Sequence, residues 1–262
     1  MMKVLVVSNQ KGGVGKTTTA ISLGAALVEH GQRVLIVDLD PQANATSGLG
    51  VGKNSAIYSV LLKEMPISES IAHTALEGLD LIPSGPDMAG AEVELVPVMA
   101  REFRLRQALR GAASSYDTVI IDCPPSLGLL TVNALAAGDG VVVPVQCEYY
   151  ALEGLAQLLN TIEAVRQRLN EHLEVLAIVL TMEDARNRLS MQVIEEVRKH
   201  FPSLVADTRI PRTVRLAEAP SHGKPISVYD PTSRAAKAYA DLATEVERRI
   251  KAREPIALAG SA

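Results

Sequence analysis

A glycine-rich loop near the start of the chain constrains the fold more than any other stretch. Residues 4–8 form a short apolar, mostly β-branched run, residues 9–19 contain three closely spaced glycines, and an apolar-periodic run then extends to about residue 30. This order predicts a strand, a loop and a helix, which is the context that phosphate binding requires. Glycines let backbone N–H groups converge on anionic oxygens, and a helix that begins near Lys16 adds its positive N-terminal end.

The loop itself supplies the candidate ligands of a nucleotide. Lys16 is expected to reach the β- and γ-phosphates, and Thr17 to ligate Mg²⁺. The usual phosphate-loop pattern has glycine where this chain has Gln10, and the chain carries an additional lysine at position 11. The nucleotide-binding residues predicted in the loop are Lys11, Gly12, Gly13, Val14, Gly15, Lys16, Thr17 and Thr18.

Composition favours one α/β domain. The chain has 262 residues, 47% of them hydrophobic, which is sufficient for a core, and only 3% are aromatic. Val, Ile, Leu and Ala must therefore build that core, as they do in parallel sheets. No apolar run has the length of a membrane span and no signal peptide precedes the first strand, so we expect a cytoplasmic protein. Cys123 and Cys147 lack the spacing of a metal site and are expected to be reduced and packed.

Charge is distributed unevenly along the chain. The net charge is −4, but residues 1–180 carry 12 Lys and Arg against 19 Asp and Glu, whereas residues 181–262 carry 14 against 11. This asymmetry permits a basic face on an acidic protein. A solvated helix face would give the same count, so the asymmetry alone does not identify a partner.

Two further apolar runs end in carboxylates. Residues 33–38 predict a second buried strand that leads into Asp38 and Asp40, and residues 118–122 predict another that ends at Asp122. A carboxylate at the end of a central strand, beside a phosphate loop, lies where Mg²⁺ needs an anionic partner. The same residue could instead cap a helix. With the phosphate loop present, the metal role is favoured for Asp122.

The rest of the chain alternates between strand and helix patterns. Further strands are predicted at residues 79–83, 140–145, 175–181 and 205–210, and helices at 55–65, 68–75, 148–170, 191–200 and 234–253. Neither a repeat nor a Pro/Ser-rich linker interrupts the alternation. We therefore expect a single-domain, doubly wound α/β fold, with a mostly parallel sheet covered by helices on both faces. The domain is expected over residues 1–254, followed by a flexible tail at 255–262.

Several of these strings together resemble the ParA/MinD family of P-loop ATPases. Residues 11–18, 38–42 and 120–125 are similar to its deviant Walker A, switch I and Walker B motifs. A narrower resemblance, to the chromosomal ParA proteins that are also called Soj, rests on residues 147–155, 210–216, 218–221 and 223–226. The resemblance covers about residues 2–250. It implies a P-loop ATP hydrolase that uses ATP and Mg²⁺.

The resemblance also implies roles for individual residues. In the family the signature lysine, here Lys11, reaches across a face-to-face homodimer to the partner's nucleotide. Asp40 would orient or activate the attacking water and Asp122 would hold Mg²⁺ through water, while Asp38 would support the metal shell. Lys11, Lys16 and Asp40 are thus the catalytic candidates. A solvated loop charge at Lys11, and turn-forming roles for Asp38 and Asp40, stay open as alternatives.

Two assignments concern the outer part of the nucleotide. Pro211 resembles a residue of the family's base-contacting loop, and Glu148 resembles a residue near the ribose and the dimer interface. A strand-to-helix loop at this edge of the sheet would look similar without any nucleotide contact.

DNA is the second ligand that the resemblance implies. Arg186 and Arg215 match arginines that bind double-stranded DNA non-specifically in ParA/Soj proteins, and neutralisation of backbone phosphates explains why arginine suffices. Arg188, Arg212 and Lys224 could extend this patch, although Asn187 and Arg188 depart from the family's string. The implied function is chromosome or plasmid partitioning by a nucleoid-associated ATPase whose hydrolysis a ParB-type centromere-binding protein stimulates.

Two other classes of relative are less compatible with the sequence. A membrane-associated ATPase like MinD would need a C-terminal amphipathic helix, but residues 256–260 lack a bulky apolar face and Pro255 interrupts the pattern. Relatives that carry redox clusters would need paired cysteines. We therefore expect no membrane partner and no cluster.

Overall fold

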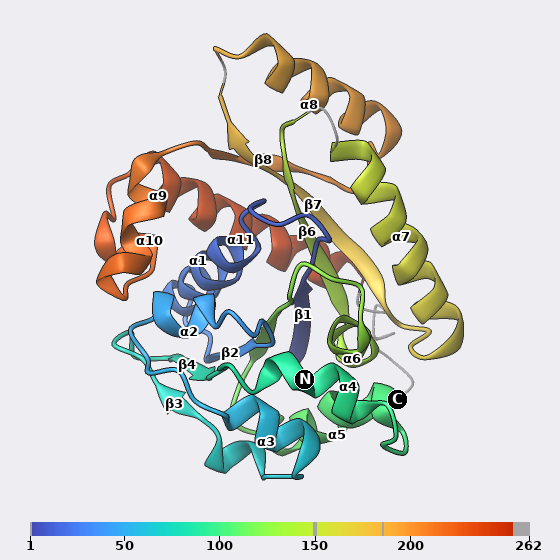
Figure 1. The fold of residues 1–262 in the computed structure, drawn as a ribbon. Coiled ribbons are helices and arrows are strands. Elements are labelled where there is room, and N and C mark those ends of the chain that lie inside the picture. The colour runs from blue at the N-terminus through green and yellow to red at the C-terminus, as the bar shows by residue number, and fades with distance from the viewer. Residues whose placement is uncertain (1, 149–150, 185, 254–262) are drawn as a thin grey trace, which may run out of the picture.

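One eight-stranded sheet organises the molecule. The computed structural model describes residues 2–148, 151–184 and 186–253. The strand order is β3-β4-β2-β5-β1-β6-β7-β8, and every neighbouring pair is parallel except the antiparallel pair of β3 and β4. Helices cover both faces of the sheet (Figure 1). The predicted single-domain α/β fold is confirmed, whereas the predicted tail at 255–262 lies outside the described residues.

The elements have the following bounds. The strands are β1 (Lys3–Val7), β2 (Val34–Asp38), β3 (Ala72–His73), β4 (Leu79–Ile82), β5 (Thr118–Asp122), β6 (Gly140–Gln146), β7 (Glu174–Glu183) and β8 (Val205–Pro211). The α-helices are α1 (Lys16–Glu29), α2 (Asn44–Gly48), α3 (Ala56–Leu62), α4 (Met88–Leu95), α5 (Arg104–Leu109), α6 (Leu129–Ala137), α7 (Ala151–Arg168), α8 (Arg188–His200), α9 (Val214–Glu218), α10 (Ile226–Tyr229) and α11 (Arg234–Arg253). Short 3₁₀ turns are η1 (Ile67–Glu69), η2 (Arg101–Phe103), η3 (Arg110–Ala112) and η4 (Ala219–His222).

The central strands are buried on both faces, which explains their continuous apolar runs. Because side chains alternate along a strand, Val4 and Val6 of β1 join one apolar cluster, whereas Leu5 and Val7 join the other. The first cluster packs against α3 to α8, and the second against α1, α2, α10 and α11. Figure 1 shows α1 and α11 together on one side of the sheet. Small aliphatic side chains thus fill both layers, as the low aromatic content requires.

The prediction for residues 68–75 is wrong. Instead of a helix, this segment contains the end of η1 and the short edge strand β3. Ala72 and His73 pair with Leu81 and Asp80 of β4, and the His73 Nδ1 lies 2.8 Å from the Asp80 Oδ1. Pairing with a neighbouring strand therefore decides the conformation of a segment whose own pattern suggested a helix.

A buried ion pair fastens α11 to the far edge of the sheet. Glu245 accepts hydrogen bonds from the backbone N–H groups of Asp207 (3.0 Å) and Thr208 (3.1 Å), and Arg249 Nη2 lies 2.8 Å from the Glu245 Oε1. The Arg249 guanidinium also donates to the backbone carbonyls of Leu176, Ser203, Leu204 and Val205. Both charges are thereby satisfied where β7 and β8 meet α11.

We expect Arg249→Met to lower the free energy of unfolding by about 3 kcal/mol, because the buried Glu245 loses its partner. Arg248→Met is the matched control. The Arg248 side chain is 68% exposed and this variant loses only one ion pair, of 3.7 Å to Asp207, so the free energy of unfolding should change by less than about 0.5 kcal/mol. Urea unfolding followed by circular dichroism measures both variants. Equal destabilisation by the two substitutions would contradict this role of Arg249.

Candidate functional site

The strand order brings the predicted phosphate loop and two carboxylates to one edge of the sheet. The loop follows β1, whose neighbour β5 ends at Asp122. On the other side of β5, β2 ends at Asp38, which is the register partner of Asp122. The carboxyl ends of parallel strands therefore meet beside the loop, as expected for a ligand site in an open α/β sheet.

The backbone of the loop has the shape of a phosphate cradle. Gly13 (φ 74°) and Gly15 (φ 88°) adopt left-handed conformations that residues with a Cβ rarely adopt, and Gly15 directly precedes α1. A Cβ placed on Gly12 or Gly13 would meet no atom within 4 Å, so open space lies beside these residues. Lys16 is nearly buried and its amine donates to the Lys11 carbonyl at 3.0 Å.

Neighbouring strands hold this loop in place. The Thr181 hydroxyl, on β7, donates to the Val14 carbonyl at 2.8 Å. The Asn9 amide donates to the Pro144 carbonyl at 2.7 Å and its oxygen accepts from the Lys11 N–H at 3.0 Å. The loop is consequently fixed from β6 and β7 before any ligand arrives, which lowers the cost of ordering it on binding.

Asp122 has the properties of a metal ligand. The side chain is fully buried, and neither carboxylate oxygen has a hydrogen-bond partner of ordinary geometry. Burial raises the pKa of Asp122 well above its usual range, the Asp38 charge raises it further, and Thr17 and Lys16 act in the opposite direction. A buried, unsatisfied carboxylate close to Thr17 fits Mg²⁺, which typically takes one or two protein ligands and completes its shell with phosphate and water.

Asp38 is engaged within the protein instead. Its Oδ2 accepts from the N–H (2.8 Å) and the hydroxyl (2.7 Å) of Thr46, and its Oδ1 accepts from the Asp40 N–H at 3.1 Å. Burial raises the pKa of Asp38 to about 6, although these hydrogen bonds favour the charged form. Asp38 thus positions α2 and Asp40, and its predicted support of the metal shell stays a prediction.

Asp40 belongs to the same group of acidic side chains as Asp38 and Asp122. Its side chain is 7% exposed, and its Oδ1 accepts from the Gln42 N–H at 2.9 Å. Its carbonyl accepts from the Ser84 hydroxyl at 2.8 Å, so the turn after β2 is held from β4. Among the described residues no three His, Cys, Asp or Glu side chains form a metal cluster, so a cation here would also need ligand oxygens from phosphate or water.

Unlike the Lys16 amine, the Lys11 amine has its partner outside the phosphate loop. Its amine lies 2.8 Å from the Glu148 Oε2, beyond the end of β6, and both side chains are substantially exposed. The Gln146 amide donates to the other oxygen of Glu148 at 2.5 Å. The structure therefore brings the predicted site residues Lys11 and Glu148 into contact. It also places the amines of Lys11 and Lys16 in different surroundings.

Pro211 lies beside the phosphate loop. It lines a hollow of about 270 Å³ together with Gly15, Thr18, Thr181 and Tyr239, among others. This position is compatible with a nucleotide base at the end of the cradle. The assignment of Pro211 as a base contact stays a prediction.

The predicted DNA-binding side chains are exposed but differ in their partners. Arg186 pairs with Asp184 at 3.2 Å, and Arg215 pairs with Glu218 at 3.1 Å and Asp230 at 3.4 Å. Arg188 is the first residue of α8, and Arg212 and Lys224 are exposed in the segments after β8 and η4.

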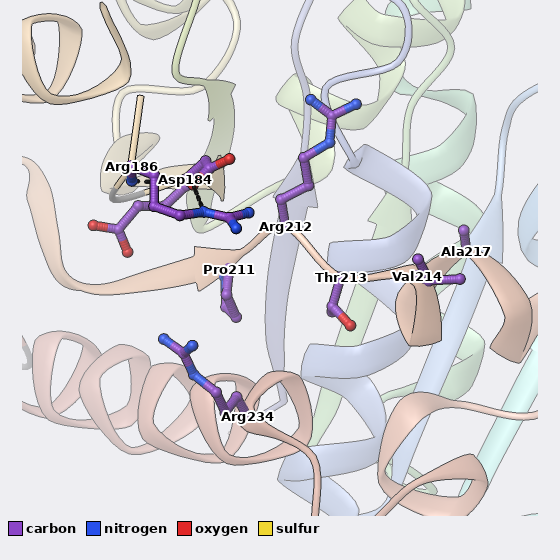
Figure 2. Close-up of a pocket in the computed structure, with 9 residues that line it drawn as sticks. Asp184, Arg186, Pro211, Arg212, Thr213, Val214, Ala217 and Arg234 are labelled. Atoms are coloured by element: carbon purple, nitrogen blue, oxygen red, sulfur yellow. Dashed lines mark hydrogen bonds and ion pairs between the residues drawn. The ribbon is translucent and has the colours of Figure 1, made fainter. Parts of the chain in front are cut away.

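Arg186 and Arg212 come together at a hollow of about 930 Å³ (Figure 2). Arg234, which the sequence analysis missed, lines the same hollow from the start of α11. In the sequence Arg234 is a single arginine at the start of a predicted helix, which gives no sign of a site. Only the fold brings it to the hollow.

Comparisons with known proteins agree with this geometry. The sequence family described as an AAA domain matches residues 2–175. The sporulation initiation inhibitor protein Soj of Bacillus subtilis is 57% identical over 249 residues, which are 94% of this chain and 98% of that protein. The chromosome partitioning protein ParA of Myxococcus xanthus is 53% identical over 256 residues, covering 97% of this chain and 90% of that protein.

Solved structures give the same picture. A protein described as cobyrinic acid a,c-diamide synthase from Mycobacterium smegmatis, with bound ADP and magnesium, aligns with a TM-score of 0.84 at 41% identity over 96% of each chain. A plasmid partition protein of Borrelia burgdorferi bound to AMPPNP aligns with a TM-score of 0.77 at 26% identity, over 96% of this chain and 99% of that chain. The predicted resemblance is confirmed, and the chain belongs to the ParA/Soj family of P-loop ATPases.

Proposed function

We propose that this chain is a Mg²⁺-dependent ATPase switch for chromosome or plasmid partitioning. ATP binding drives a face-to-face homodimer, the dimer binds double-stranded DNA non-specifically, and a ParB-type centromere-binding partner stimulates hydrolysis and release. The nucleotide state thereby controls whether this cytoplasmic protein is on the nucleoid. One observation carries the proposal: Lys16 is folded into its own phosphate loop, whereas the Lys11 amine lies outside it, against Glu148.

The two lysines can divide the chemistry between two subunits. Phosphoryl transfer depends mainly on positioning and on positive charge at the migrating phosphoryl group, and a cation supplied by a second molecule can complete the site. Lys16 serves the nucleotide of its own subunit. Lys11 is exposed enough to leave Glu148 and serve the nucleotide of the facing subunit, so that ATP becomes part of the dimer interface.

The carboxylates have separate tasks in this reaction. Asp122, through water, and Thr17 would hold Mg²⁺, which would supply positive charge to the phosphate oxygens. Asp40 orients the attacking water and accepts its proton through its free carboxylate oxygen. Asp38 keeps Asp40 in place through the hydrogen bond from the Asp40 N–H.

The relatives support this assignment. The similar proteins are named for chromosome partitioning, and aligned structures hold ADP with magnesium or an ATP analogue. Arg186, Arg188, Arg212, Arg215 and Lys224 give each subunit a basic face. Two such faces in one dimer raise DNA affinity through avidity, without a new contact.

We expect Lys11→Ala to bind nucleotide nearly as well as the unmodified protein but to lose the ATP-dependent dimer, because the interface loses the cation that reaches the partner's phosphates. Lys63→Ala, which removes an exposed lysine after α3, is the matched control. Light scattering coupled to size-exclusion chromatography, with ATP and with ADP, measures the association state. Normal dimerisation of Lys11→Ala with ATP would overturn the proposal.

We expect Asp122→Asn to stabilise the nucleotide-free protein at pH 7, because it removes a buried acidic group whose pKa is raised by burial. Because its pKa is raised in the folded state, Asp122 keeps its proton to a higher pH in the folded protein than in the unfolded chain, so its contribution to stability falls as pH rises above about 4. The difference in free energy of unfolding between the variant and the unmodified protein should therefore grow between pH 4 and pH 7.

Thermal unfolding with and without ATP and Mg²⁺ checks this prediction. The variant should lose the magnesium-dependent part of the stabilisation, whereas the exposed control Asp241→Asn should change neither quantity. A variant that is less stable than the unmodified protein without nucleotide, or that keeps the full magnesium effect, would show that Asp122 is not the metal ligand.

A further inference from the structure

Three arginines from three separate elements converge on one surface hollow. Arg186 comes from the loop between β7 and α8, Arg212 from the segment after β8, and Arg234 is the first residue of α11. In Figure 2, Arg186 and Arg212 lie above Pro211, with the Arg212 guanidinium pointing away from it, and Arg234 lies below Pro211 at the start of α11. These three residues do not share one helix face. Their convergence arises only because the fold brings residues 186, 212 and 234 to the same place.

The charge in this hollow is not balanced internally. Among the described residues, Arg212 and Arg234 form no ion pair, and the Arg186 side chain, which pairs with Asp184, is 92% exposed. Of the two acidic residues that line the hollow, Glu183 lies 2.6 Å from the Arg209 guanidinium and Asp184 pairs with Arg186. Hydrogen bonds from Arg186 lower the pKa of Asp184 and the charge of Arg212 also helps to lower it, so Arg234 is the arginine of this hollow for which the described residues offer no acidic partner.

The hollow also borders the predicted base pocket. Pro211, Arg212, Thr213 and Ala217 line both the 930 Å³ hollow and the 270 Å³ hollow, and the smaller one reaches Gly15 and Thr18 of the phosphate loop. The segment after β8 thus forms a wall that both hollows share. A nucleotide in the smaller hollow would contact the same short segment that carries Arg212.

We propose that Arg234, together with Arg212 and Arg186, lines a surface that binds backbone phosphates of DNA. The proposal rests on the DNA binding proposed above and adds Arg234 to it as a contact residue. Guanidinium groups match phosphate oxygens with paired N–H donors, and an open hollow admits a phosphate that remains joined to a polymer. Contacts from guanidinium groups to backbone phosphates carry no sequence information, so the site would bind DNA of any sequence.

Arg234→Gln tests the site in the full-length protein with ATP. Its affinity for double-stranded DNA of arbitrary sequence, measured by fluorescence anisotropy at several salt concentrations, should fall about three- to tenfold. The dependence of affinity on salt should weaken by about one phosphate contact per subunit. Arg106→Gln, which removes an exposed arginine from α5, changes the net charge equally and should leave both quantities unchanged. Arg234→Lys keeps the charge and should retain most of the salt dependence.

The comparison with Arg186→Ala and Arg215→Ala separates the two proposals. If these variants lose DNA binding while Arg234→Gln binds DNA as Arg106→Gln does, the site at Arg234 is wrong and the DNA function stands. If all of them bind DNA fully, the DNA surface proposed above is itself wrong. If Arg234→Gln loses binding to anionic liposomes but not to DNA, a membrane is the ligand and the present inference fails.

Discussion

The buried carboxylate of Asp122, which accepts no hydrogen bond of ordinary geometry, is the constraint on which the rest of the site depends. The parallel register places Asp38 directly beside it, so two acidic groups share one buried edge. Such a site is destabilising by itself, and a cation that binds only the folded state would relieve it. Thr17, the phosphate cradle and the turn that holds Asp40 surround this point. The energetic cost of burying Asp122 beside Asp38 is thereby linked to the affinity for magnesium and phosphate.

The same chain satisfies buried charge fully where no ligand is needed. Glu245 and Arg249 are both nearly buried, and each forms several hydrogen bonds to the backbone of β7, β8 or the turns between them. By contrast, Asp122 in the core accepts no hydrogen bond of ordinary geometry, and Arg234 at the surface forms no ion pair among the described residues. Polar groups without such partners thus mark the places where ligands are proposed to act, and fully hydrogen-bonded charges mark the places where elements are fastened together.

Sequence patterns predicted the features that local chemistry determines. The buried parallel strands have continuous apolar runs, and the left-handed turns of the loop require glycine, so β1, β5 and the cradle were predictable. The helix α6 was not predicted because it is apolar around most of its surface and shows no periodicity. The strand β3 depends on pairing with β4, and the roles of Asp38 and Arg234 depend on Thr46 and on the distant residues 186 and 212. Those features follow from tertiary contacts, which no local pattern contains.

Mixing two inactive variants tests most directly whether Lys11 acts on the nucleotide of the facing subunit. Lys11→Ala subunits keep Asp40, and Asp40→Ala subunits keep Lys11. In a mixed dimer one site then has its own Asp40 and the partner's Lys11, so the account predicts ATP hydrolysis that neither variant shows by itself. If the mixture stays inactive although mixed dimers form, Lys11 acts within its own subunit and the account is wrong.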